Sequence, residues 1–246
     1  MNKTKSKYDT LTKLYIKRLI IIISLFFVGL TGHSQILISI LLGDKLNSDG
    51  LEFGLETGVN WSQISNFESS SALGTWNIGF YFDIRMKNQL SLYTGVLVKS
   101  NLGLKNLSEN DLERLQAITY NEEGVYSQKL NYFLVPALAK YKFNKAYYVE
   151  AGPQFGLMYK SWIEYYSSVN GKEATIKEFN KDKINKLDAG FTFGLGYILG
   201  KGKGMTIGAK YYLGLANVYK NVSDTKNSSL FLKVNIPIGA GKKQEL

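Results

Sequence analysis

The stretch "DAGFTFGLGYILG" (188–200) decides the fold class, because its two alternating faces have opposite character. Successive side chains of a β-strand point to opposite sides of the sheet. One face carries Asp188, Thr192 and three glycines, whereas the other is continuously apolar from Ala189 to Leu199. Glycine weakens a strand interior, so several on one face indicate that bulkier neighbours need the space.

Seven further stretches alternate apolar and polar residues with a period of two, which is the pattern of a half-buried strand. They are 51–61, 76–85, 90–99, 131–143, 147–160, 205–216 and 229–239. The connections alternate between long (62–75, 100–130, 161–186, 217–228) and short (86–89, 144–146, 200–204). This alternation predicts an antiparallel up-and-down meander of eight strands.

Two closed architectures fit eight such strands, and the glycines distinguish them. A soluble barrel has an apolar interior, whereas an outer-membrane barrel turns its apolar face to lipid and its polar face to the lumen. The polar face here mixes glycine with Tyr81, Tyr93 and Tyr212, as expected for a lumen barely wide enough for side chains. The sequence therefore predicts an all-β protein, an eight-stranded antiparallel up-and-down transmembrane β-barrel with a packed polar lumen.

The N-terminus has the order of a secretory signal peptide. Lys17 and Arg18 precede the apolar run "LIIIISLFFVGL" (19–30) and the small residues of "TGHSQ". Twelve residues are too few for a membrane-spanning helix, although a buried helix or an anchor are the alternatives. We expect a signal peptide at 1–34, an N-terminal segment at 35–50, the barrel at 51–241, a tail at 242–246, and location in the outer membrane.

Charge on the polar face predicts a neutralised plug. The chain has a net charge of +10, of which the first 34 residues contribute +5, and the modest remainder does not indicate nucleic acid. Buried charges must be paired, so a structural network is favoured over an acid/base pair or an ion path. The turn at 144–146 would place Lys140 opposite Glu150 as a cross-strand ion pair. The lumen network is expected to comprise Glu52, Glu56, Asp83, Arg85, Lys99, Lys140, Glu150, Asp188, Lys210 and Lys233.

Aromatic residues sort by strand end, as in a barrel that crosses two membrane interfaces. The interface residues are expected to be Trp61, Trp76 and Trp162 at the long-loop end and Phe143, Tyr147 and Tyr197 at the short-turn end.

Residues for catalysis are scarce. Cysteine is absent, and the single histidine, His33, lies in the expected signal peptide. Nucleophile systems based on Ser–His or Cys–His and His-dependent metal sites are therefore excluded from the mature chain. The stretch "GKGKG" (200–204) resembles a phosphate loop only in composition and is expected to form a flexible turn. We predict no catalytic residue, cofactor or metal, and hence no enzyme.

Function is expected in the long loops. Ser108 and Asp111 have the spacing of a capping box, which predicts a short helix within 108–118. The charged stretch 170–186 predicts a solvated hairpin extension or a helix.

Several stretches resemble the PorT-like outer-membrane β-barrel family of Bacteroidota. These are "LLGDKLNSDGLEFGLETGVNWS" (41–62), "YFLVPALAKYKF" (132–143), "YYVEAGPQFGLMY" (147–159) and "FTFGLGYILG" (191–200). The resemblance implies fold and location more than activity, although one relative is tied to type IX secretion. The chain departs from many such barrels by ending in "KKQEL" instead of an aromatic residue.

Together these features predict a non-enzymatic barrel with an envelope-structural or surface-binding role. An accessory component of a secretion system and a narrow channel for small solutes are the alternatives. The expected partners are outer-membrane lipid and a protein bound through the long loops, without nucleic acid.

Overall fold

The computed structural model describes residues 50–69, 71–143, 146–169, 171–202 and 204–238. The expected signal peptide, nearly all of the 35–50 segment and the C-terminal tail lie outside these residues. The strands and helices are β1 (Leu51–Ile64), β2 (Ser71–Lys87), β3 (Leu90–Lys105), α3 (Glu109–Leu115), β4 (Val125–Phe143), β5 (Tyr147–Val169), β6 (Lys172–Phe179), η2 (Lys181–Lys183), β7 (Leu187–Ile198), α4 (Leu199–Gly202), β8 (Thr206–Asn217) and β9 (Lys226–Pro237).

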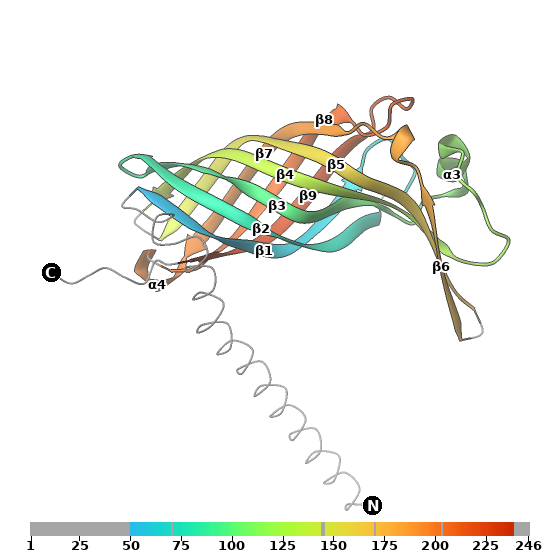
Figure 1. Cartoon of the computed structure of the whole chain (residues 1–246), viewed down its shortest axis with the longest axis horizontal. Coiled ribbons are helices and arrows are strands. Elements are labelled where there is room, and N and C mark those ends of the chain that lie inside the picture. The colour runs from blue at the N-terminus through green and yellow to red at the C-terminus, as the bar shows by residue number, and fades with distance from the viewer. Residues whose placement is uncertain (1–49, 70, 144–145, 170, 203, 239–246) are drawn as a thin grey trace, which may run out of the picture. The chain divides into compact units, whose positions relative to one another are not determined.

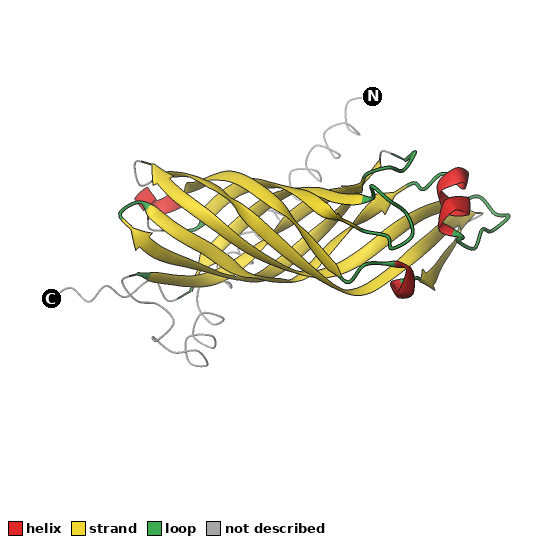
Figure 2. Ribbon diagram, turned by 90° about the horizontal axis from the view of Figure 1, so that it is seen from above, coloured by secondary structure: helices red, strands yellow, loops and turns green. Residues whose placement is uncertain are grey.

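Eight of the strands close into a ring. Their order is β4-β3-β2-β1-β9-β8-β7-β5. Because β4 also pairs with β5, the ring is closed and has no unpaired strand edge. All pairings are antiparallel, and the tilted strands wind around the ring (Figures 1 and 2). The predicted fold class is therefore confirmed. The ninth strand, β6, pairs only with β5 and projects beyond the ring as the hairpin extension expected within 170–186.

The strands extend further toward the long loops than the sequence predicts. β5, for example, runs to Val169, and β4 begins at Val125. Irregular pairing occurs between Leu97 and Ser100 of β3, and again where β4 and β5 pair near Asn131. An extra residue at such a bulge moves all later side chains to the opposite face. The simple alternation is lost there, which is why the predicted strands ended too early.

The glycines of the opening stretch make room for side chains across the lumen. A Cβ at Gly196 would lie 2.4 Å from the Tyr148 hydroxyl, and one at Gly194 would lie 2.8 Å from Oε1 of Glu150. Gly196 is paired with Gly208 of β8, and a Cβ at Gly208 would also lie 2.4 Å from the Tyr148 hydroxyl. The predicted role of these glycines in a crowded lumen is thus confirmed.

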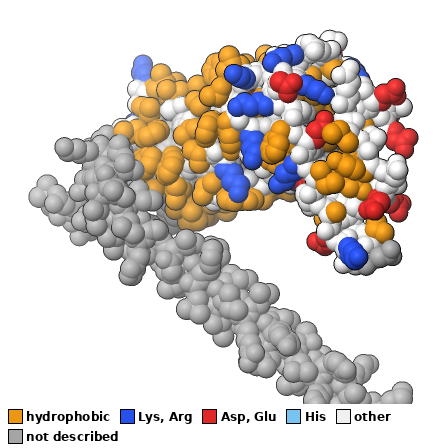
Figure 3. Space-filling view, turned by 45° about the vertical axis from the view of Figure 1, so that its right-hand side comes forward, with side chains coloured by type: hydrophobic (Ala, Val, Ile, Leu, Met, Phe, Trp, Pro, Cys, Tyr) orange, Lys and Arg blue, Asp and Glu red, His pale blue; other side chains and the backbone are white. Residues whose placement is uncertain are grey.

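The outer face of the ring carries exposed apolar side chains. Leu187, Leu195 and Leu215 are 71%, 64% and 68% exposed, values that are high for leucine. Hydrophobic side chains form a broad region over the end of the barrel opposite the loop helix α3 (Figure 3). Among the described residues, no helix is long and apolar enough to cross a membrane.

Two predicted connections have definite structures. Ser108 caps α3, and the reciprocal hydrogen bonds of the capping box with Asp111 are both present, as predicted. The stretch 200–204 begins within the single helical turn α4, where Gly200 has a φ of +64°. This agrees with the turn expected there, and the left-handed Gly200 allows the turn to close.

Candidate functional site: the lumen and the loop cap

Charged residues fill the lumen near the short-turn end. Lys140 lies 2.9 Å from Asp83, Lys210 lies 2.6 Å from Glu56, and Lys233 lies 2.5 Å from Glu150. None of these six side chains is more than 3% exposed. Each charge therefore has a partner of opposite sign, which buried charges require.

Tyrosines connect the ion pairs to one another. The Tyr93 hydroxyl donates to Glu56 and accepts a 2.8 Å hydrogen bond from Nδ2 of Asn235. The Lys233 ammonium lies 4.1 Å from the centre of the Tyr93 ring. Tyr81 stacks on Tyr93 at 5.5 Å and donates a 2.9 Å hydrogen bond to Glu52. Rings and hydrogen bonds thus occupy the space between the charges.

The register at the 144–146 turn places Lys140 opposite Glu150, but these two residues do not form the expected ion pair. The Lys140 ammonium binds Asp83 instead, and the Glu150 carboxylate binds Lys233 from β9. Long lysine side chains in a narrow barrel reach carboxylates on other strands across the lumen. The strand register alone therefore does not determine which lysine forms an ion pair with which carboxylate.

Two residues assigned to the lumen network lie elsewhere. Lys99 is exposed on the outer face, with its ammonium 3.9 Å from the centre of the Trp76 ring, because the bulge after Leu97 reverses the facing of β3. Arg85 is exposed near the short turn. Asp188 is buried apart from the three ion pairs and accepts a 2.8 Å hydrogen bond from Asn227.

Toward the long loops a cluster of apolar side chains also lies in the lumen, next to buried polar residues such as Asn60, Ser62 and Gln128. Leu102, Leu104, Leu130 and Leu134 are completely buried there and belong to a cluster that includes Tyr132, Met158, Ile163 and Phe231. The expected polar lumen therefore describes only part of the interior. The sequence did not predict this layer, because the bulge after Leu97 turns Leu102 and Leu104 inward and because β4, which carries Leu130 and Leu134, is apolar on both faces.

Most aromatic residues expected at membrane interfaces are exposed on the barrel. Trp61 and Trp76 are 42% and 49% exposed, and Phe143, Tyr147 and Tyr197 also belong to the exposed apolar residues. Trp162 differs, since it is only 7% exposed. The projecting strand β6 covers it, with the Phe179 ring 6.4 Å away.

A loop cap closes the long-loop end. It comprises the β1–β2 connection (65–69), α3 with its flanking residues 106–124, η2 and the β8–β9 connection (218–225). The Asp111 carboxylate accepts hydrogen bonds from the backbone N–H groups of Glu68 (3.0 Å) and Ser69 (3.2 Å). The Arg114 guanidinium donates a 2.6 Å hydrogen bond to the Asn66 carbonyl. These contacts join α3 to the β1–β2 connection.

The same helix anchors the cap to the barrel interior. Leu112 and Leu115 are 2% and 4% exposed and pack in the apolar cluster of the upper lumen. Tyr219 from the β8–β9 connection joins that cluster, and its hydroxyl donates a 2.6 Å hydrogen bond to Gln128 of β4. Burial raises the pKa of Tyr219 well above its usual value, so the hydroxyl remains protonated. The cap is thus continuous with the barrel core.

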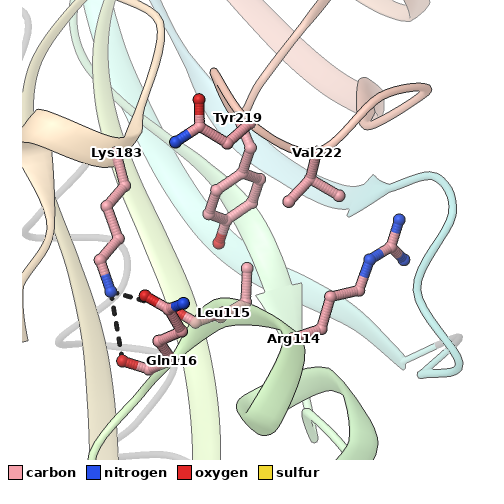
Figure 4. Close-up of a pocket in the computed structure, with 7 residues that line it drawn as sticks. Arg114, Leu115, Gln116, Lys183, Tyr219 and Val222 are labelled. Carbon is pink, nitrogen blue, oxygen red and sulfur yellow. Dashed lines mark hydrogen bonds between the residues drawn. The ribbon is translucent and has the colours of Figure 1, made fainter.

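A small cleft lies between α3, η2 and the β8–β9 connection (Figure 4). Its volume is about 220 Å³, and the lining residues are Arg114, Leu115, Gln116, Lys183, Tyr219, Asn221 and Val222. The Lys183 ammonium donates hydrogen bonds to the carbonyl groups of Leu115 (2.9 Å) and Gln116 (3.2 Å) at the end of α3. The lining therefore combines two cationic and two amide side chains with Leu115, Tyr219 and Val222.

The cleft residues come from three connections that are distant in sequence, and no motif links them. The Ser108–Asp111 capping box and the charged stretch 170–186 each indicated a structured segment of the cap, but nothing in the sequence joined them into one site. Over the described part of the chain, no group of three or more His, Cys, Asp or Glu side chains could hold a metal ion.

Comparisons with known proteins agree with this architecture. The family described as "Outer membrane protein beta-barrel domain" matches residues 44–220. A search of curated proteins found no match to the sequence.

Solved structures with similar strand arrangements have low sequence identity. Ail of Yersinia pestis, in complex with the heparin analogue sucrose octasulfate, is 13% identical, with 77% of this chain and 99% of Ail covered and a TM-score of 0.41. Neisserial surface protein A is 10% identical, with 76% and 99% covered and a TM-score of 0.42. OprG of Pseudomonas aeruginosa is 8% identical, with 76% and 93% covered and a TM-score of 0.36.

The family match spans most of the chain, and the closed ring with its apolar outer surface is the structure that such a match requires. The chain therefore belongs to the outer-membrane β-barrel family and is a protein of the outer membrane.

Proposed function

We propose that this protein is a non-conducting, non-enzymatic outer-membrane barrel that binds a partner at the cell surface through its loop cap. The proposal rests on the contrast between the barrel interior, which is filled, and the loop cap, which contains a cleft. Paired charges and packed leucines fill the lumen, whereas the cap is tied together by hydrogen bonds and contains a cleft. A filled lumen also supports an envelope-structural role.

We place the loop cap outside the cell. The N-terminal signal peptide would deliver the chain from within, and β1 starts at the short-turn end of the barrel. In outer-membrane barrels the short turns face the periplasm and the longer loops face outward. The cap is then available to partners in the medium or on other cells.

The cleft suits a small group with negative charge. Arg114 and Lys183 contribute positive charge, Gln116 and Asn221 contribute amide groups, and no carboxylate belongs to the lining. A volume of about 220 Å³ is below the range of roughly 300–1,000 Å³ of most ligand pockets. It would therefore hold one acidic end group of a larger molecule.

A protein partner of the cap is the second candidate, in line with the resemblance to the PorT-like family and its link to secretion. Apolar residues on the cap and on β6 favour it, since Ile118 is 57% exposed and Ile176 is 40% exposed. Crosslinking in native membranes, followed by mass spectrometry, tests this candidate. We expect crosslinked peptides from the cap, and crosslinks restricted to the short turns would contradict it.

Conductance tests the proposed closed lumen directly. We expect purified protein in planar lipid bilayers to produce no stable current steps in concentrated KCl, where a porin measured in parallel produces them. Steady, reproducible steps would refute the closed lumen and would favour a narrow channel for small solutes.

A further inference from the structure

Charged side chains on the outside of the barrel are arranged in layers. Beyond the apolar region comes a zone rich in Lys and Arg, and the Asp and Glu side chains lie mainly toward the far end of the molecule (Figure 3). We define the lysine collar as five lysines on β3 to β6 that are exposed or partly exposed. It comprises Lys99, Lys105, Lys129, Lys160 and Lys177.

The collar begins where the apolar surface ends. Lys99 directly follows Val98, which is 37% exposed, and Lys160 lies three residues beyond Leu157, which is 48% exposed. In the β4–β5 register, Lys160 is opposite Asn131, and Lys129 is opposite Trp162. Lys129 and Lys160 therefore lie diagonally across the β4–β5 pair, just beyond the exposed apolar residues, where lysine side chains can reach lipid headgroups.

Aromatic rings support three of the collar residues, among them Lys177, whose ammonium is 5.5 Å from the centre of the Trp162 ring. The Lys99 ammonium is 3.9 Å from the centre of the Trp76 ring. The Lys160 ammonium is 5.5 Å from the Trp162 ring and 5.2 Å from the Phe179 ring. Aromatic side chains are typical of the membrane interface, and they hold these cations close to the barrel wall.

The collar retains a positive charge. Among the described residues, the one carboxylate that forms ion pairs with collar lysines is Glu164, which binds Lys129 and lies 3.9 Å from Lys177. Five lysines and one glutamate leave a charge of +4. In the part of the chain that the structure describes, Lys99, Lys105 and Lys160 form no ion pair with a carboxylate.

We propose that the lysine collar binds the phosphorylated headgroup of a glycolipid in the outer leaflet of the outer membrane. Ammonium groups at the edge of an apolar surface complement an anionic headgroup whose acyl chains lie against that surface. The occupant is a lipid, because the adjoining apolar wall continues from the collar into the membrane. This inference rests on the proposed orientation, which places the long-loop end in the outer leaflet, but it does not depend on the cleft or on the closed lumen.

Binding to a defined lipid tests the proposal. Full-length protein in detergent is titrated with bisphosphorylated lipid A and with the same lipid after removal of its phosphates, and bound lipid is measured by native mass spectrometry. The collar variant carries Lys99→Gln, Lys105→Gln and Lys160→Gln. A control variant with the same change in charge carries Lys172→Gln, Lys181→Gln and Lys220→Gln, which lie in the cap or on β6 and are exposed.

We expect the collar variant to bind bisphosphorylated lipid A roughly tenfold or more weakly and the control variant to bind like the wild type. Replacement of the same three collar lysines by arginine should preserve binding and serves as a variant with unchanged charge. Equal loss in the collar and control variants would overturn the proposal. Equally tight binding of the dephosphorylated lipid, or loss of binding in the arginine variant, would also overturn it.

Discussion

The pairing of Glu150 offers the sharpest test of the lumen. Its carboxylate lies 2.5 Å from the Lys233 ammonium on β9, although Lys140 on β4 is its neighbour in the sheet register. Each of Glu150, Lys233 and Lys140 can be replaced by methionine singly. The double variants Glu150→Met/Lys233→Met and Glu150→Met/Lys140→Met then show whether Glu150 pairs across the lumen with Lys233 or along the sheet with Lys140.

The expected magnitudes follow from burial. The side chains of Lys233 and Glu150 are 1% and 0% exposed, so loss of one partner leaves an unpaired charge that costs roughly 3–5 kcal/mol. With a denaturant dependence of about 4 kcal/mol per M in guanidinium chloride, the midpoint falls by roughly 1 M. The Lys233→Met/Glu150→Met pair leaves no orphaned charge, and its cost should be much smaller than the sum of the single costs.

Lys140 should behave differently. Its ammonium binds Asp83 at 2.9 Å, and Lys142 lies 3.1 Å from the same carboxylate, so Asp83 keeps a cationic neighbour after Lys140→Met. We expect the effects of Lys140→Met and Glu150→Met to add to within about 1 kcal/mol.

Reversible unfolding in lipid vesicles, followed by the fluorescence of the three tryptophans, provides the assay. A coupling free energy between Glu150 and Lys140 as large as that between Glu150 and Lys233 would refute the ion pairs described here. Single variants that unfold like the wild type would refute the packed lumen, because water would then solvate the orphaned charge.

Three further predictions concern packing, the cap and orientation. Gly196→Val would place a Cβ 2.4 Å from the Tyr148 hydroxyl and should prevent formation of the compact species on unheated electrophoresis gels, whereas Gly50→Ala, with no atom within 4 Å, should fold normally. Asp111→Ala removes the acceptor of three backbone N–H groups and should cost about 1 kcal/mol locally; unchanged hydrogen exchange in α3 and the β1–β2 connection would contradict this. Trypsin added to intact cells should cut beside the exposed Lys172, and cleavage confined to the turn at 86–89 would reverse the proposed orientation.

Much of the architecture could be predicted from local sequence pattern. Alternation with a period of two identified all eight strands of the ring, and the glycines around Gly194 correctly indicated a crowded interior. The Ser108–Asp111 spacing identified α3 in the same way. These features succeed because each depends on residues close together in the chain, where strand pleat and helix capping impose fixed spacings.

Other features depend on the closed ring. The bulge after Leu97 turned Lys99 outward and brought Leu102 inward, so part of the lumen is apolar. Projection of β6 over Trp162 buried a residue expected to be exposed.

The sequence by itself thus determined which stretches form strands, how many close the ring and which face is crowded. Only the tertiary structure decided that Lys233, and not Lys140, pairs with Glu150, and that Arg114 and Lys183 line one cleft. The physical reason is that flexible side chains on strands and loops far apart in sequence become neighbours only once the barrel has closed.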